Sequence, residues 1–266
     1  MSMILPHVAR GPEGRPPIVF LHGFAGDRET WLGQLIPLET RHRVIAFDLP
    51  GHGEALDWPK IGHAGLAAQA VIDSLAALDH RRFHLVGHSM GGAIATIAAF
   101  KLAGTGEVAS LTLVAPGGFG PEIDARLLRR FAVATEAAEI EALNERFFGF
   151  ETVIPPAAVA RIVEGRRDPR VCPTLARIAE AILDGERQKG FDLARLADLP
   201  HPIRLIWGEQ DRVLPIRQCE AVPGVVAVHR FPGVGHMPHL EMPREVTRLI
   251  AESAAAVPPA IRSSRR

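Results

Sequence analysis

The chain has 266 residues, in which 30 Lys and Arg are balanced by 30 Asp and Glu, so its formal net charge is zero. This length suits one α/β domain or one domain with an inserted subdomain, and the balanced charge gives no argument for nucleic acid as a partner. The two cysteines, Cys172 and Cys219, lack CxxC spacing, which excludes a disulfide framework and a thiolate zinc site.

The sequence also shows no pattern of a transmembrane segment or a signal peptide. No stretch approaches the roughly 20 uncharged apolar residues that cross a bilayer. Met1 to Gly14 lacks the pattern of a secretory signal peptide. Together with the cysteine usage, these features predict a cytoplasmic protein without a membrane partner.

The first part of the chain alternates short apolar runs with helical patterns. Because near-continuous apolar strands separated by helices are buried on both faces, the pattern predicts an α/β fold with a mostly parallel central sheet and helices on both faces. The predicted elements here are strands at Ile18–Leu21, Val44–Phe47, Phe83–Val86 and Leu111–Val114, and helices at Leu66–Leu78 and Ala93–Leu102.

This alternation then stops for about 80 residues. From residue 117 to about 199 we find helical patches and no convincing strand, and strands resume at Ile203–Trp207 and Val225–Phe231 before a final helix after Pro243. We therefore predict a core of residues 1–116 and 200–266, interrupted by a helical cap insertion at 117–199. The predicted helices of the cap cover 125–138, 156–164 and 174–183.

The strongest chemical signal is Gly87-His88-Ser89-Met90-Gly91, which fits the G-x-S-x-G nucleophile elbow. It follows a predicted strand and precedes a predicted helix, which is the context that this motif needs. We predict Ser89 as the nucleophile. The helix N-terminus behind it would offer backbone N–H groups to a developing oxyanion, with the Met90 amide as one donor.

The loop after the first parallel strand, His22-Gly23-Phe24-Ala25-Gly26, is the predicted source of the second oxyanion donor, the Phe24 backbone N–H. We expect His22 to be a structural residue. The turn that starts at Asp48 and ends at Gly53 is also expected to be structural, beneath the site.

A carboxylate is expected on the loop after Trp207. Asp211 is a better candidate than Glu209, because it lies deeper in the loop and precedes an apolar anchor and Pro215. Its role would be to orient a histidine and to stabilise the imidazolium.

His236 lies next to Gly235, before the closing helix, where it can approach the serine. It is the predicted general base, and His239 is expected to be structural. A metal pair of His236 and His239 is disfavoured by Pro238 and by the lack of a third ligand nearby. We therefore expect neither metal nor cofactor. The order Ser89, Asp211, His236 is the one expected for a nucleophile elbow in an α/β sheet.

These motifs resemble the α/β-hydrolase superfamily over about residues 16–253. Within it the chain is similar to the hydrolase-like domain of acetoin dehydrogenase E2 (dihydrolipoamide acetyltransferase) components. The resemblance implies an α/β-hydrolase fold with a helical cap and a serine hydrolase activity. The stretches that carry it are Val44–Gly53, His84–Gly92, Ser110–Asp124, Trp207–Pro215 and Gly233–Glu241.

Some features of that family are missing here. The sequence has no lipoyl domain and no HxxxDG acyltransferase signature, so we expect a free-standing hydrolase rather than lipoyl-linked acetyl transfer. A carbon–carbon (meta-cleavage type) hydrolase stays an alternative, although such enzymes usually have Asn before the serine and Trp after the histidine, where this chain has His88 and Met237. A non-catalytic partner of an acetoin dehydrogenase-type complex is the third hypothesis.

The expected substrate is a small molecule with an acyl group, most simply a carboxylic ester. Association as a homodimer or with a dehydrogenase complex is left open. The cap should set specificity through an apolar set that either lines the site or forms the cap's own core. The members of this set are Leu127, Leu128, Phe131, Phe147, Phe148 and Phe150.

Overall fold

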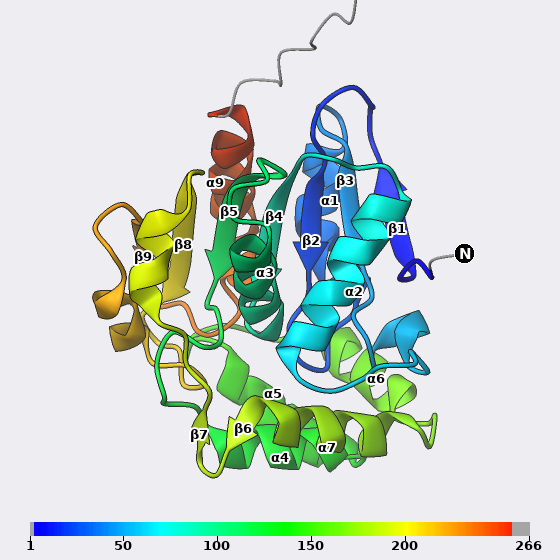
Figure 1. The fold of residues 1–266 in the computed structure, drawn as a ribbon. Helices are drawn as coiled ribbons and strands as arrows, with labels where there is room; N and C mark the ends of the chain where they lie inside the picture. The colour runs from blue at the N-terminus through cyan, green and yellow to red at the C-terminus, as the bar shows by residue number, and fades with distance from the viewer. Residues whose placement is uncertain (1–2, 257–266) are drawn as a thin grey trace, which may run out of the picture.

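The computed structural model describes residues 3–256, which are built around a seven-stranded sheet (Figure 1). The strand order is β1-β3-β2-β4-β5-β8-β9. Strand β1 pairs antiparallel with β3, and the other neighbours are parallel, so the prediction of a mostly parallel sheet is confirmed. The strands are β1 His7–Arg10, β2 Ile18–Leu21, β3 Val44–Phe47, β4 Phe83–His88, β5 Val108–Val114, β8 Ile203–Gly208 and β9 Ala227–Phe231.

Helices cover both faces of the sheet. Successive side chains of a strand point to opposite faces, and the central strands are apolar at consecutive positions, so both faces must be buried. In β2, Val19 and Leu21 lie in one apolar core, and Ile18 and Phe20 lie in the other. Helices α2 and α3 cover the first face, and α1 and α9 cover the second (Figure 1). Their bounds are α1 Leu32–Leu38, α2 Ala64–Ala77, α3 Met90–Lys101 and α9 Pro243–Ala255.

Between β5 and β8 the chain leaves the sheet. We call residues 117–199 the inserted segment. It packs at one end of the sheet (Figure 1), and it also contains a two-stranded antiparallel hairpin that the sequence did not suggest. Its elements are α4 Ala125–Val133, α5 Ala137–Asn144, η3 Glu145–Phe147, α6 Pro156–Gly165, α7 Val171–Ile182, β6 Leu183–Asp184, β7 Arg187–Gln188 and η4 Leu193–Asp198.

The structure adds short elements to those predicted. Strand β1 and helix α1 were not predicted, and β9 begins at Ala227 rather than at Val225. Residues 257–266 of the predicted core lie outside the described residues. The remaining short helices are η1 Arg28–Trp31, η2 Gly53–Ala55, η5 Ile216–Ala221 and α8 Pro238–Glu241.

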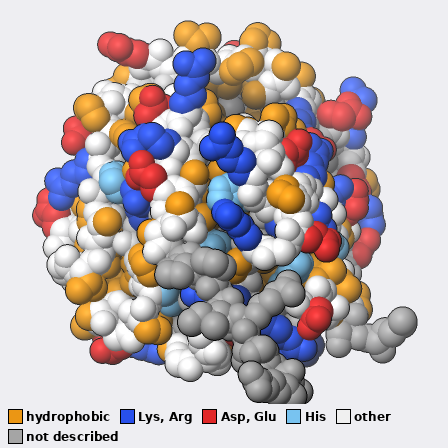
Figure 2. Space-filling view, turned by 90° about the horizontal axis from the view of Figure 1, so that it is seen from above, with side chains coloured by type: hydrophobic (Ala, Val, Ile, Leu, Met, Phe, Trp, Pro, Cys, Tyr) orange, Lys and Arg blue, Asp and Glu red, His pale blue; other side chains and the backbone are white. Residues whose placement is uncertain are grey.

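The surface has mixed charge. Basic and acidic side chains are interspersed over the end of the molecule opposite the inserted segment (Figure 2). This distribution agrees with the equal numbers of acidic and basic residues. Within residues 3–256, no helix has both the length and the apolar character needed to cross a membrane.

Candidate active site

Ser89 occupies a strained turn between β4 and α3. Its backbone has φ 51° and ψ −116°, a conformation that a residue with a side chain rarely adopts. The turn is possible because Gly91 lets the start of α3 approach the end of β2. A Cβ on Gly91 would lie 2.2 Å from the carbonyl oxygen of Leu21 and 2.4 Å from that of His22. The elbow therefore presents the serine side chain at the carboxyl ends of the strands.

The imidazole of His236 lies against Ser89. Its Nε2 is 2.9 Å from Ser89 Oγ, although 147 positions separate the two residues in the chain. The histidine is buried, and its backbone is fixed at both ends. Its N–H donates to the Phe147 carbonyl at 2.7 Å, and its carbonyl accepts from His88 Nε2 at 2.9 Å.

Asp211 lies on the other side of the imidazole, with Oδ2 2.8 Å from His236 Nδ1. The carboxylate accepts three further hydrogen bonds, from the Trp207 indole at 2.9 Å and from the amides of Val213 and Leu214 at 2.8 Å each. A carboxylate that accepts so many hydrogen bonds is held in one orientation. The sequence did not predict the role of Trp207, although this residue stands in the same motif.

These contacts define the proton positions. An ionised carboxylate only accepts, so His236 Nδ1 carries the proton and Nε2 is left to accept the Ser89 hydroxyl proton. The structure thus brings together the three side chains that the sequence predicted as catalytic, in the order serine, histidine, aspartate. Glu209, the rival acid, is exposed to solvent.

The two predicted oxyanion donors both border the space in front of Ser89. Met90 is the first residue of α3, and the first N–H groups of a helix lack partners within it. Phe24 follows Gly23, which approaches so closely that a Cβ placed on it would lie 3.3 Å from Ser89 Cβ. The next amide, that of Ala25, already donates to His52 Nε2 at 3.2 Å.

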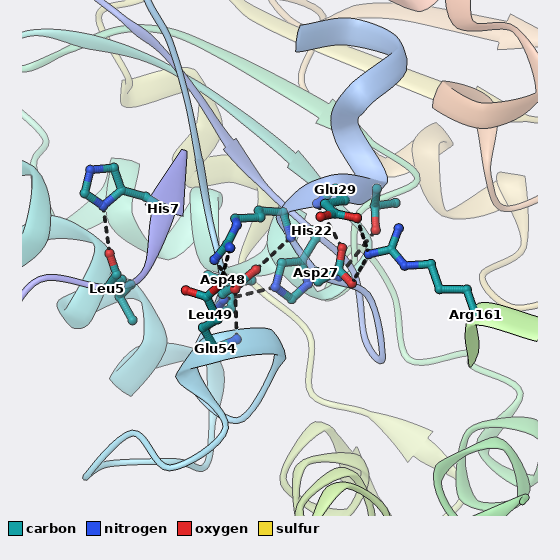
Figure 3. Close-up of polar contacts among 11 residues, drawn as sticks. Leu5, His7, His22, Asp27, Glu29, Asp48, Leu49, Glu54 and Arg161 are labelled. Atoms are coloured by element: carbon teal, nitrogen blue, oxygen red, sulfur yellow. Dashed lines mark hydrogen bonds and ion pairs between the residues drawn. The ribbon is translucent and has the colours of Figure 1, made fainter. Parts of the chain in front are cut away.

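His22 joins this loop to the turn after β3, and Figure 3 shows its ring beside Leu49. Its Nδ1 donates to the Gly23 carbonyl at 2.8 Å, and its Nε2 accepts from the Leu49 amide at 3.0 Å. Burial lowers the pKa of His22, so the ring stays neutral and keeps this pattern. Both ring nitrogens are engaged by the backbone, which agrees with the expected structural role.

The turn after β3 braces the same loop. The buried carboxylate of Asp48 accepts from the Arg28 amide at 2.8 Å, from the Arg28 guanidinium at 2.7 Å and from the Glu54 amide at 2.9 Å. Asp48 thus ties the β3 turn to the segment that follows Phe24, as expected for a structural turn beneath the site.

His239, the rival of His236, is fully buried behind the site. Its ring packs against those of Trp31 and His88, with centroid distances of 4.5 and 4.4 Å and ring planes tilted by 35° and 45°. Burial lowers the pKa of His239 to about 3, so it is neutral at physiological pH. Among residues 3–256, no group of three or more His, Cys, Asp or Glu side chains is arranged to hold a metal ion.

Ser89 and His236 open onto a cavity of about 1230 Å³ between the sheet and the inserted segment. Its lining is predominantly apolar, and four members of the predicted apolar set take part, namely Leu128, Phe131, Phe147 and Phe148. Leu127 is buried outside the lining. The prediction for Phe150 was wrong, because its side chain is 70% exposed and packs under the Arg212 guanidinium, 4.7 Å from the ring centre.

An ion-pair cluster borders this cavity. Arg161 of α6 reaches across to the core and contacts Asp27 at 2.6 Å and Glu29 at 2.8 Å (Figure 3). All three residues border the cavity. These half-exposed pairs contribute little to stability on their own, but they join the inserted segment to the loop that carries Phe24.

Comparison with known proteins identifies the family of the chain. The pattern of the alpha/beta hydrolase family matches residues 18–249. An acetyltransferase component (dihydrolipoyllysine-residue) of the acetoin cleaving system of Pseudomonas putida is 33% identical over 240 residues, or 90% of this chain. The chain spans only 63% of the length of that relative.

Two further similarities are to proteins with other named activities. Monoacylglycerol lipase abhd6-B of Xenopus laevis is 26% identical over 265 residues, which cover 92% of this chain and 77% of that protein. The structure of a variant of a meta-cleavage product hydrolase (CumD) matches with a TM-score of 0.83 and 20% identity, over 97% of this chain and 98% of that one. This last similarity concerns the fold alone. With its central sheet, its elbow and the match over most of its length, the chain belongs to the alpha/beta hydrolase family.

Proposed function

We propose that the chain is a carboxylesterase-like serine hydrolase in which Ser89 is the nucleophile, His236 the general base and Asp211 the residue that orients the base. The observation that carries this proposal is the hydrogen-bond chain from Asp211 through His236 to Ser89, with distances of 2.8 and 2.9 Å, at the edge of a large apolar cavity. This is the arrangement that nucleophilic acyl transfer requires.

The reaction starts with proton transfer. His236 Nε2 accepts the Ser89 hydroxyl proton while Oγ bonds to the substrate carbonyl carbon, and the resulting oxyanion accepts hydrogen bonds from the Phe24 and Met90 amides. His236 then gives the proton to the leaving oxygen as the carbon–oxygen bond breaks, which leaves an acyl group on Ser89. Water that loses a proton to His236 attacks this acyl group, and Ser89 departs with the proton.

The lining of the cavity supports an apolar acyl group as substrate. In this proposal residues 117–199 act as a cap, and Leu128, Phe131, Phe147 and Phe148 contact the acyl chain. The similarity to a monoacylglycerol lipase supports an ester. Acetyl transfer by the Pseudomonas putida relative is not carried over, because this chain matches only part of that protein.

The test is hydrolysis of a series of p-nitrophenyl esters from acetate to decanoate by the wild type and by Ser89→Ala. Turnover should fall about a thousandfold or more in the variant, since an alanine cannot form the acyl-enzyme. The chain length with the highest kcat/KM would measure the acyl subsite. Near-full activity in a folded Ser89→Ala protein would refute the assignment of the nucleophile.

A wild type that hydrolyses none of these esters would contradict the ester substrate. Labelling with a fluorophosphonate then separates the remaining hypotheses. Covalent labelling at Ser89 would show an active nucleophile with another substrate, such as the dione of a carbon–carbon hydrolase. Absence of labelling would favour the non-catalytic partner of an acetoin dehydrogenase-type complex.

A further inference from the structure

The carboxylate of Glu241 receives hydrogen bonds from both sides of the histidine loop. Glu241 is the last residue of α8, five positions after His236. Its Oε1 accepts from the amide of Gly235 at 2.9 Å and from that of Met237 at 3.3 Å. These two amides belong to the residues directly before and after His236, so one oxygen fixes the peptide units on either side of it.

The other oxygen of the same carboxylate reaches the inserted segment. Glu241 Oε2 accepts from the Gly149 amide at 2.8 Å and from the Thr152 hydroxyl at 2.7 Å. Both partners lie just after η3, which ends at Phe147, whose carbonyl accepts from the His236 amide. A single side chain thus joins the histidine loop to the segment that covers the cavity.

A carboxylate suits this position. Its two oxygens offer about four acceptor sites, and all four neighbours are donors. A glutamine of the same shape would replace one oxygen with an NH₂ group, which would face the Gly149 amide donor in one orientation and the Gly235 and Met237 amide donors in the other. Such a conflict displaces the loop, and a shift of about 1 Å in a catalytic group can cost about a hundredfold in rate.

We propose that Glu241 is a positioning residue that holds His236 at hydrogen-bond distance from Ser89 and couples the base to the inserted segment. This inference rests on the proposed function, because it takes His236 as the general base. It assigns Glu241 no contact with substrate: the residue acts through the backbone of Gly235 and Met237, and through the seating of residues 149–152.

The experiment measures the rate constant of fluorophosphonate labelling at Ser89, which reports the serine–histidine geometry whatever the natural substrate is. Glu241→Gln should label about 10- to 100-fold more slowly than the wild type. With any ester that the wild type hydrolyses, kcat should fall while KM changes less than about threefold. The proton NMR signal of the His236 Nδ1–H that faces Asp211 should shift or broaden, which a purely structural role would not cause.

The matched control is Glu141→Gln, which removes the same charge from an exposed position of α5. It should label at the wild-type rate. Equal labelling rates for Glu241→Gln and the wild type would overturn the inference and leave the proposed function intact. A wild type that is not labelled at all would instead contradict the proposed function, so the two failures are distinguishable.

A second pair of variants covers the case in which Glu241→Gln does not fold. Thr152→Val removes one of the four donors with little change in shape, whereas Thr152→Ser keeps the hydroxyl. Labelling should slow about two- to fivefold in the valine variant and stay near the wild-type rate in the serine variant. Equal rates in both variants would overturn the coupling between the inserted segment and the histidine loop.

Discussion

The carboxylate of Asp211 faces the imidazole and three other donors at once. Asparagine in this place cannot satisfy the same neighbours, because its NH₂ group would meet either the backbone amides or His236 Nδ1. In the second case Nδ1 must accept, so the ring proton moves to Nε2, which can then no longer accept the Ser89 proton.

Asp211→Asn should therefore lower kcat/KM for a p-nitrophenyl ester by about 10³- to 10⁴-fold while the protein stays folded. The measurement is steady-state kinetics together with a circular dichroism spectrum. Glu209→Gln is the comparison, since Glu209 is the rival acid on the same loop and is exposed. A loss confined to Glu209→Gln would show that the acid was assigned to the wrong residue.

At the level of single residues, the sequence predicted Ser89, Asp211 and His236, which the structure brings together. Each stands in a local pattern that follows a strand. The contacts of Trp207 and Glu241 were not predictable in this way, because they depend on partners whose position only the folded chain defines. For Glu241 two of the four partners, Gly149 and Thr152, lie about 90 positions away in the inserted segment.

Among the elements, the elbow between β4 and α3 depends most on close backbone contact. Gly91→Ala would drive a methyl group into two backbone carbonyl oxygens, those of Leu21 and His22, at 2.2 and 2.4 Å. Neither can rotate away as a side chain would, so α3 must move from β2. We expect a loss of about 3 kcal/mol or more in the free energy of unfolding, measured by urea denaturation.

The control for this change is Gly224→Ala, in the exposed loop before β9. A Cβ there meets no atom within 4 Å. Because alanine restricts the unfolded chain, the free energy of unfolding should stay constant or rise by up to about 1 kcal/mol. Equal effects of the two substitutions would contradict the close contact at the elbow.

Elements with a strong apolar pattern were predicted, and weak ones were not. The buried strands β2 to β5 and the helices α2 and α3 follow the expected periodicity, although their ends shift by a few residues. Strand β1 lies at the sheet edge and is only partly buried, so its sequence carries little pattern. Helix α1 has seven residues and contains Pro37, and the hairpin of β6 and β7 has two residues a strand.

On the scale of the whole molecule, several histidines are buried in their neutral form. Burial lowers the pKa of His52 and His239 to about 3 and that of His84 to about 4. In the unfolded chain their pKa is about 6.5. Between these pH values the unfolded chain binds protons that the folded chain does not bind. The contribution of these histidines to the free energy of unfolding is therefore fully present above about pH 7 and is lost as the pH falls toward 4.

The urea midpoint should accordingly be lower at pH 5 than at pH 8. Each of these histidines contributes up to about 2 kcal/mol to the difference. His84→Gln, which removes one of them, should show a smaller difference between the two pH values than the wild type. A midpoint that does not change between pH 8 and pH 5 would contradict the neutral state of these rings.

The inserted segment leaves the carboxyl end of β5 and returns to the amino end of β8, and these two strands are parallel neighbours, with Val114 paired to Ile206 and Leu111 to Ile203. Because the strands are parallel, the two junctions lie at opposite ends of the strands, so the segment is a crossover connection that also covers the cavity. A crossover of different length can join the same two strands at a small entropic cost. Residues 147–152 of this segment also hydrogen-bond the loop of His236 and the side chain of Glu241, so a replacement segment has to keep those contacts as well as span the two strand ends.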